Sequence, residues 1–148
     1  MTRFVLDSNL YIEAIRDATK APGLAEFTVA SLAQIILHAV VVQELLAGAV
    51  SESARRDVYR DLVQPFERRG RILTPSYHAW RRSGEIVATL IDRGELTVGG
   101  VPRSFTNDAV LAASCREEGV TLITRNRRDF ERIQRLERFR FVDPWPTA

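Results

Sequence analysis

The chain has very little cysteine and very little lysine. Cys115 is the only cysteine among 148 residues, so no internal disulfide and no cluster of thiolate metal ligands can form. This agrees with a reducing compartment. Of the 21 basic residues only Lys20 is lysine, and the planar fork of arginine suits phosphate recognition. A GC-rich genome, whose codons favour arginine, explains the same bias, so the bias alone decides little.

The chain also lacks long hydrophobic runs. No apolar stretch approaches the roughly 18 residues that span a bilayer, so we expect no membrane segment. Asp7 interrupts the N-terminus where the apolar stretch of a signal peptide would continue, which predicts a cytoplasmic protein. A hydrophobic fraction of 45% and a charged fraction of 27% are ordinary for a globular protein. The length predicts one domain, residues 1–148, with a core of its own.

Apolar runs that resemble strands alternate with segments that have helical periodicity. Such an alternation predicts a parallel sheet covered by helices on both faces, with right-handed crossovers. The segment 94–103, with two adjacent glycines and a proline, is the clearest loop. The expected strands are 4–6, 35–42, 71–74, 120–124 and 139–142, and the clearest expected helices are 24–32, 51–69, 75–93, 107–118 and 129–136.

Acidic or amide side chains follow three of the expected strands. Asp7 follows the first strand, Glu44 the second and Asn126 the fourth, with Asp129 three residues further on. Asp108 instead opens the alanine-rich helix that leads into the fourth strand. Because helices begin where strands end in this alternation, all of these side chains belong at the carboxyl edge of the sheet. Open parallel sheets place their active sites at that edge.

Several carboxylates that converge on a partly buried place repel one another. Keeping them ionised without a counter-charge costs several kcal/mol through desolvation. Oxygen-rich sites of this kind suit Mg²⁺ or Mn²⁺, which bind carboxylates together with water. Such a cation can activate a water molecule and stabilise a phosphodiester during in-line attack. The pattern therefore favours metal-dependent phosphodiester chemistry that needs no serine, cysteine or histidine nucleophile.

Each acidic residue also has a purely structural interpretation. Asp7 could be a helix N-cap, and Glu44 or Asp108 in a first helical turn could complement the helix dipole. Asp129 could form an ion pair with a nearby arginine. Each structural interpretation can explain its own residue. That all four should apply at once in one chain is harder to accept. Three further residues of types that occur in active sites are interpreted as structural: His38, His78 and Cys115.

Four segments together resemble the motifs of the PIN-domain family, in the family's order and over nearly the whole chain. The segment 4–9 is similar to the opening of PIN domains, in which an aspartate closes the first strand. The segments 41–48, 107–113 and 122–130 resemble the second, third and fourth motifs. Each motif is weak alone, and the four together are specific. Domains of this size are commonly VapC-type toxins of toxin–antitoxin pairs.

The resemblance implies a three-layer α/β/α fold with a parallel sheet of about five strands. It implies an endoribonuclease that depends on Mg²⁺ or Mn²⁺ and often acts on structured RNA such as tRNA. It further implies a homodimer and a small antitoxin that blocks the active site. Carried over by position, Asp7 and Asp108 are the main metal ligands, and Glu44 completes the site or holds a metal-bound water.

The fourth motif departs from the family pattern. Asn126 stands where many members have aspartate, and Asp129 lies one helical turn further on. A strongly bound second metal ion is therefore in doubt. Four arginines near the motifs are candidates for binding the RNA backbone, with a solvated surface as the alternative for each: Arg103, Arg125, Arg127 and Arg128.

Other classes fit the sequence less well. A dinucleotide-binding fold would have a glycine-rich loop after the first strand. A phosphatase with a nucleophilic aspartate would have a second acid at position 9, which is Asn9. A receiver domain would have an early acidic pair and a late lysine. The remaining rival is a PIN-like module that binds RNA or a protein partner without cutting.

Overall fold

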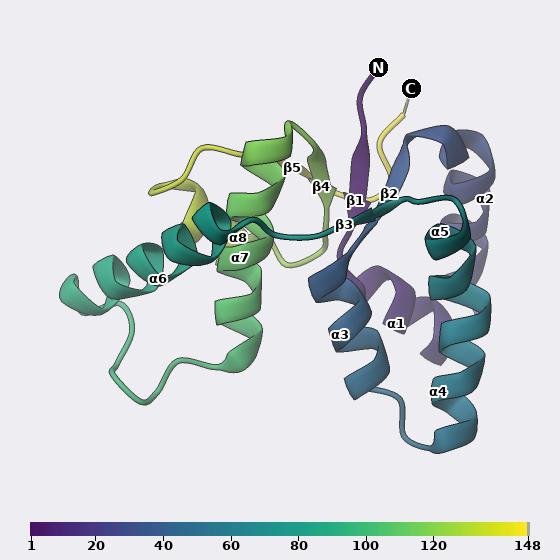
Figure 1. Ribbon diagram of the computed structural model, residues 1–148, viewed down its shortest axis with the longest axis horizontal. Coiled ribbons are helices and arrows are strands. Elements are labelled where there is room, and N and C mark those ends of the chain that lie inside the picture. The colour runs from purple at the N-terminus through teal and green to yellow at the C-terminus, as the bar shows by residue number, and fades with distance from the viewer. Residues whose placement is uncertain (148) are drawn as a thin grey trace.

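Five short strands form one parallel sheet at the centre of the molecule (Figure 1). The computed structural model describes residues 1–147; Ala148, which the expected domain includes, lies outside the described residues. The strand order is β3-β2-β1-β4-β5, and every neighbouring pair is parallel, as the alternation predicts. The strands are β1 Phe4–Leu6, β2 Ile35–His38, β3 Ile72–Leu73, β4 Thr121–Ile123 and β5 Arg140–Val142.

Helices cover both faces of the sheet and complete the three-layer fold. None of the helices within residues 1–147 is both long and apolar enough to cross a membrane. The α-helices are α1 Ser8–Arg16, α2 Ala21–Ser31, α3 Ala39–Ala47, α4 Glu52–Val58, α5 Gln64–Arg68, α6 Tyr77–Asp92, α7 Arg103–Glu118 and α8 Arg127–Gln134. Two further helical segments are the 3₁₀ turn η1 Leu32–Gln34 and the π-helical turn η2 Tyr59–Val63, of which η2 interrupts the single helix expected over 51–69.

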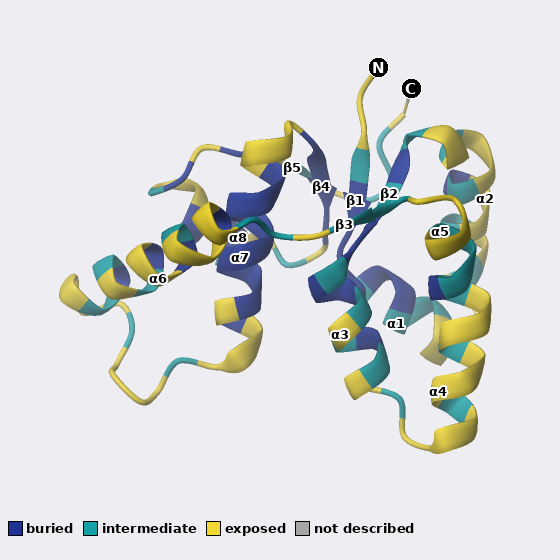
Figure 2. Ribbon diagram, viewed as in Figure 1, coloured by how far each residue is buried: buried dark blue, intermediate teal, exposed yellow. Residues whose placement is uncertain are grey.

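The core has two halves, one on each face of the sheet. Successive strand residues point to opposite faces, so Val5 packs with α6, α7 and α8 while Leu6 packs with α1, α2 and α3. Leu122 and Ile123 in β4 divide in the same way. Both faces are therefore apolar, which is why the strands read as continuous hydrophobic runs and not as alternating ones. Figure 2 shows the resulting band of buried residues through the sheet.

The second strand is shorter than predicted. The expected strand 35–42 ends at His38, and the three valines that follow belong to α3. The Nδ1 atom of His38 accepts a hydrogen bond from the backbone N–H of Val40 (3.0 Å) and so caps the helix. A short apolar run does not distinguish a buried strand from a buried helix. Glu44 consequently lies in the second turn of α3 and not at its entrance.

Helix α7 begins four residues earlier than predicted. Its first residue is Arg103, directly after Pro102, whose backbone is extended (φ −63°, ψ 146°). Asp108 therefore lies in the second turn, where it is too far from the helix start to complement the dipole in the way its structural interpretation requires. The glycines and the proline of the predicted loop 94–103 all precede the helix, which overlaps that loop only at Arg103.

Candidate active site

Asp7 lies at the carboxyl end of β1 and begins α1. Its backbone N–H donates to the carbonyl oxygen of Ile123 (2.9 Å), which extends the β1–β4 pairing by one residue. Its Oδ1 then accepts from the backbone N–H of Ser8 (2.8 Å), as an N-cap does. The Oδ2 atom accepts from the hydroxyl of Thr124 (2.7 Å) and from the amide of Asn9 (3.3 Å). The capping role and a place at the sheet edge thus coexist in one residue.

Burial dominates the electrostatics of Asp7. Only 4% of the residue is exposed, and desolvation raises the pKa of its carboxyl to about 6, in part offset by the hydrogen bond from Thr124. The negative charge of Glu44 contributes to the same rise in pKa. A carboxylate held in this way favours any cation that can enter the site.

Glu44 reaches the same region from α3. Its Oε1 atom accepts a hydrogen bond from the hydroxyl of Ser8 (3.0 Å), and its Oε2 atom accepts from the amide of Asn107 (3.5 Å). The amide of Asn107 also donates to the Oε1 of Gln43 (3.3 Å). These contacts join α1, α3 and α7 around one carboxylate.

Asp108 and Asp129 share one hydrogen-bond donor, the side-chain amide of Asn126. This amide donates to the Oδ2 of Asp108 (3.1 Å) and to the Oδ2 of Asp129 (3.2 Å). The Oδ1 atom of Asn126 accepts from the backbone N–H of Asp129 (3.5 Å) and caps α8. The amide of Asn126 therefore lies between the two acids that flank the fourth motif.

Asp108 is the most strongly perturbed acid of the site. Burial, together with the charges of Asp7, Glu44 and Asp129 and against one opposing hydrogen bond from Asn126, raises the pKa of its carboxyl to about 9. No arginine or lysine contributes to the shift in either Asp108 or Asp7. Among the acids of the site, Asp129 pairs with Arg132 (3.8 Å), whereas Asp7 and Asp108 form no ion pair within residues 1–147.

The donor set fits a hydrated divalent cation better than a fully enclosed one. Within residues 1–147, no three acidic, histidine or cysteine side chains stand close enough to enclose an ion unaided. Ser8 donates to both Asp7 and Glu44, and Asn126 donates to both Asp108 and Asp129. Hard oxygen ligands suit Mg²⁺, which keeps several of its waters. The Oδ1 of Asn9 is a buried acceptor without a hydrogen-bond partner in the described part of the chain, and a metal-bound water could satisfy it.

The structure brings together all five predicted acidic and amide residues, but it divides the four predicted arginines. Arg125 is bound to Glu13 (2.7 Å), and Arg127 is bound to Asp143 (2.8 Å) and Glu131 (3.1 Å). The exposed side chains of Arg103 and Arg128 form no hydrogen bond or ion pair within residues 1–147. These two arginines are thus the ones available to a ligand.

The polar residues that position the acids were not singled out from the sequence. Thr124 is fully buried, donates to Asp7, and accepts from the backbone N–H of Asn126 (3.0 Å). It occupies the last position of the fourth predicted strand, so the strand-end rule could have found it. Ser8 and Asn107 each precede or follow a predicted ligand directly. In these cases adjacency to an acid is the only signal in the sequence.

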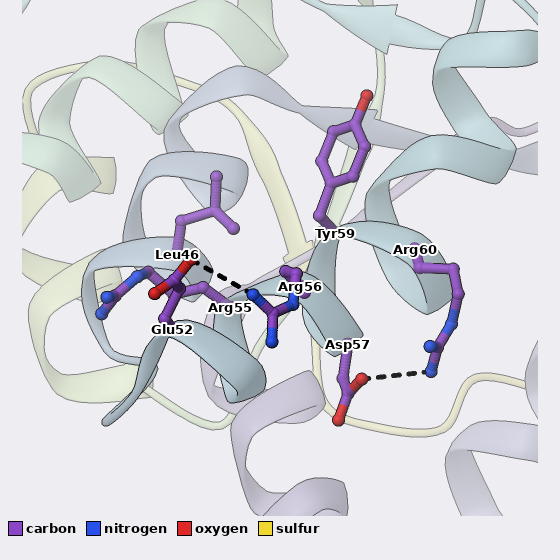
Figure 3. A pocket seen from close by; sticks show the side chains of 7 residues that line it. All are labelled: Leu46, Glu52, Arg55, Arg56, Asp57, Tyr59 and Arg60. Carbon is purple, nitrogen blue, oxygen red and sulfur yellow. Dashed lines mark hydrogen bonds and ion pairs between the residues drawn. The ribbon is translucent and has the colours of Figure 1, made fainter.

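A hollow of about 560 Å³ beside α4 lies apart from these residues (Figure 3). Its arginines are largely neutralised by acids on the same helical segment. Arg56 pairs with Glu52 (3.1 Å), and Arg60 pairs with Asp57 (3.3 Å). None of the predicted site residues lines it. The carboxyl edge of the sheet therefore remains the candidate active site.

A three-layer α/β/α domain with buried acids at the carboxyl edge of its sheet is the architecture of a PIN-type nuclease domain. The model of the PIN domain family matches residues 4–136. The chain belongs to the PIN-domain family, which confirms the resemblance seen in its motifs.

Solved structures of similar fold come from toxin–antitoxin complexes. The DNA-bound VapBC of Salmonella typhimurium is 26% identical with a TM-score of 0.71, covering 97% of this chain and 98% of that chain. VapBC2 of Rickettsia felis, bound to a promoter DNA fragment, is 21% identical with a TM-score of 0.64, covering 98% and 100%. A toxin–antitoxin complex from Klebsiella pneumoniae is 21% identical with a TM-score of 0.59, covering 97% and 98%. A search of curated proteins returned no match.

Proposed function

We propose that the chain is a divalent-metal-dependent endoribonuclease and the toxin of a toxin–antitoxin pair. One observation carries the proposal: three buried or half-buried carboxylates, Asp7, Glu44 and Asp108, lie within electrostatic reach of one another, and no basic residue contributes to the pKa shifts of Asp7 or Asp108. Membership of a nuclease family supports hydrolysis of phosphodiester bonds. The similarity to VapBC complexes supports the toxin assignment.

In this proposal Asp7 and Asp108 hold Mg²⁺ or Mn²⁺, and Glu44 completes the site or holds a metal-bound water. When bound, the ion supplies an activated water and stabilises charge on the phosphodiester. Thr124 keeps Asp7 oriented through its 2.7 Å hydrogen bond. Asn126 holds Asp108 and Asp129 apart by bonding to both. Asp129 acts through water, because it lies a helical turn beyond the strand end.

The proposed substrate is structured RNA such as tRNA, and the proposed partners are a small antitoxin and a second copy of the chain in a homodimer. Arginine guanidinium groups suit phosphates, because their donors match two phosphate oxygens at once. Arg103 at the start of α7 and Arg128 at the start of α8 flank Asp108 and Asn126 in the chain and are free of acidic partners in the described residues. We propose a cytoplasmic site of action.

Cleavage of a structured RNA pool tests the proposal directly. The purified protein should cut RNA with Mg²⁺ or Mn²⁺, and both EDTA and the substitution Asp7→Asn should abolish cutting. Asp7→Asn keeps an oxygen that can cap α1, so a matched thermal unfolding curve shows whether the fold persists. A folded, antitoxin-free, metal-loaded preparation that cuts nothing would instead support the rival, a PIN-fold module that binds RNA or protein.

Arg103→Ala should weaken RNA binding without affecting the fold. Loss of one phosphate contact should reduce the slope of log K against log salt by about 0.7 for single-stranded RNA. Filter binding of RNA at several salt concentrations measures this slope, with each substitution placed in the catalytically inactive Asp7→Asn protein. Arg125→Ala is the matched control, because Arg125 is already held by Glu13 (2.7 Å). Equal slopes for the two variants would contradict the role of Arg103.

A further inference from the structure

A basic hollow of about 490 Å³ lies at the amino edge of the sheet, opposite the candidate active site. In Figure 1 this edge is where the N-terminus is labelled. The hollow is lined by the N-terminal residues, the end of α7 and the segment that enters β5, and no acidic residue lines it. Its basic side chains are Arg116, Arg138 and Arg140.

Two of these arginines lie two residues apart in the chain at the entrance to the edge strand: Arg138 precedes β5, and Arg140 is its first residue. Arg138 and Arg140 are exposed, whereas Phe139 between them is buried against Phe130 and Phe141. Alternate residues of an extended chain point to the same side and lie about 6.6 Å apart. This resembles the separation of successive phosphates along an extended nucleic-acid strand. β5 is also the last strand of the sheet, so no further strand covers it.

The two arginines differ from the other basic groups nearby. Arg116 is bound to Glu137 (2.8 Å), and Glu137 is also bound to Arg82 (2.6 Å). The guanidinium groups of Arg138 and Arg140 form no ion pair or hydrogen bond within residues 1–147. Their charges are therefore not neutralised by the fold, in contrast to the paired arginines of the hollow in Figure 3.

We propose that this hollow binds phosphate groups of the RNA backbone at a distance from the bond that is cut. The inference rests on the proposed ribonuclease function and adds a second RNA contact to it. The three residues of β5 span about 10 Å, and they lead from Arg140 to Val142, which pairs with Ile123 beside the carboxyl edge. An RNA strand lying along β5 connects the hollow with the site around Asn126. Two unpaired arginines two residues apart suit a repeating phosphate backbone better than they suit a single anion.

The test uses the double substitution Arg138→Gln/Arg140→Gln in the Asp7→Asn protein, which is expected to be catalytically inactive. Its matched control is Arg68→Gln/Arg93→Gln, two exposed arginines at the end of α5 and directly after α6 that likewise have no ion pair in the described residues. Single-stranded RNA of about 20 nucleotides is titrated at several salt concentrations. Losing two phosphate contacts should lower the salt slope by about 1.4 and the affinity by about tenfold at 0.1 M salt, while the control pair changes neither.

A second readout separates this inference from the proposed function. In the protein with Asp7 intact, the double variant should cut a trinucleotide, which is too short to reach the hollow, as fast as the parent does. It should cut the longer RNA more slowly at concentrations below saturation. If the double variant and its control bind RNA with the same slope and affinity, the inference is wrong and the ribonuclease proposal stands. If the parent neither binds nor cuts RNA, both the inference and the ribonuclease proposal are wrong. A double variant that loses affinity for polyglutamate but not for RNA shows an acidic peptide as the occupant and overturns the proposal.

Discussion

Asp108→Asn should abolish RNA cleavage and at the same time make the metal-free protein harder to unfold. Asparagine keeps the shape of the side chain and can still hydrogen bond to Asn126, but it removes one of the two proposed ligand charges. Residues that merely support metal ligands affect activity by about 10- to 100-fold, so losing a ligand charge should cost more than about 100-fold. The stability gain follows because burial and the charges of Asp7, Glu44 and Asp129 oppose the ionised form of Asp108, which the unfolded chain adopts and which asparagine does not have.

The gain in free energy of unfolding that we expect for Asp108→Asn should depend on pH. The pKa of Asp108 is about 9 in the folded protein, against 3.8 as its ordinary value, so between these limits the folded state holds a proton that the unfolded state has lost. Free energy of unfolding then falls as pH rises through this interval. In Asp108→Asn this part of the decline is absent. We expect the variant to exceed the parent by about 1 to 3 kcal/mol at pH 8 and by little at pH 4.

Urea unfolding in EDTA at pH 4, 6 and 8 measures the difference. Asp92→Asn, an exposed aspartate at the end of α6, is the matched control and should follow the parent at every pH. Adding Mn²⁺ at pH 8 should stabilise the parent and leave Asp108→Asn nearly unchanged. Equal stability of parent and variant in EDTA at pH 8 would contradict a buried, repelled carboxyl at this position.

His38→Ala should reduce the free energy of unfolding by about 3 kcal/mol. His38 is fully buried, and both ring nitrogens are used. Because Nδ1 accepts from Val40, Nε2 carries the proton and donates to the Oγ of Ser114 (2.9 Å) on α7. Alanine leaves a cavity, removes the cap of α3 and leaves the Ser114 hydroxyl with one partner fewer.

Two variants divide this loss into parts, measured by chemical denaturation at pH 7. Ser114→Ala removes only the bond to Nε2 and should cost about 1 to 2 kcal/mol. His38→Asn keeps an oxygen that can cap α3 but cannot reach Ser114, so it should fall between the parent and His38→Ala. If His38→Ala were no less stable than Ser114→Ala, the cap and the packing of the ring would contribute nothing.

Lowering the pH should reduce the difference in free energy of unfolding between the parent and His38→Ala. Burial lowers the pKa of His38 to about 4 from its ordinary value of 6.5. Between these values the unfolded chain takes up a proton that the folded chain does not, so the stability from neutral His38 is complete above pH 6.5 and is lost as pH falls through 4. Unfolding curves at pH 7, 5.5 and 4.5 check this trend.

Strand–helix alternation was sufficient to predict the parallel sheet and the edge at which the acids meet. The reason is general: in a parallel sheet every carboxyl end faces the same way. The boundary between β2 and α3 was not predictable in the same way, because Val40 and Val41 are buried whether the segment is strand or helix. The information lay in His38, whose ring nitrogen serves as a helix cap, a role usually taken by serine, threonine, aspartate or asparagine.

The arrangement within the site depended on contacts that no spacing encodes. That one amide of Asn126 would lie between Asp108 and Asp129 requires the relative placement of α7 and α8. The same holds for Arg125 and Arg127, which look like Arg103 and Arg128 in the sequence but face Glu13 and Asp143 in the fold. Charge type can be predicted from a sequence more easily than charge pairing.

Asp7, His38 and Asn126 each cap the helix that follows a strand. Helix initiation therefore freezes these side chains and their neighbours when the protein folds, before any ligand arrives. Little rotamer entropy remains to be lost on binding, so the carboxyl edge is preorganised. The same coupling restricts neutral drift: a substitution at a cap alters both the start of a helix and the geometry of the acids, so these three positions should tolerate far fewer amino acids than the equally buried core.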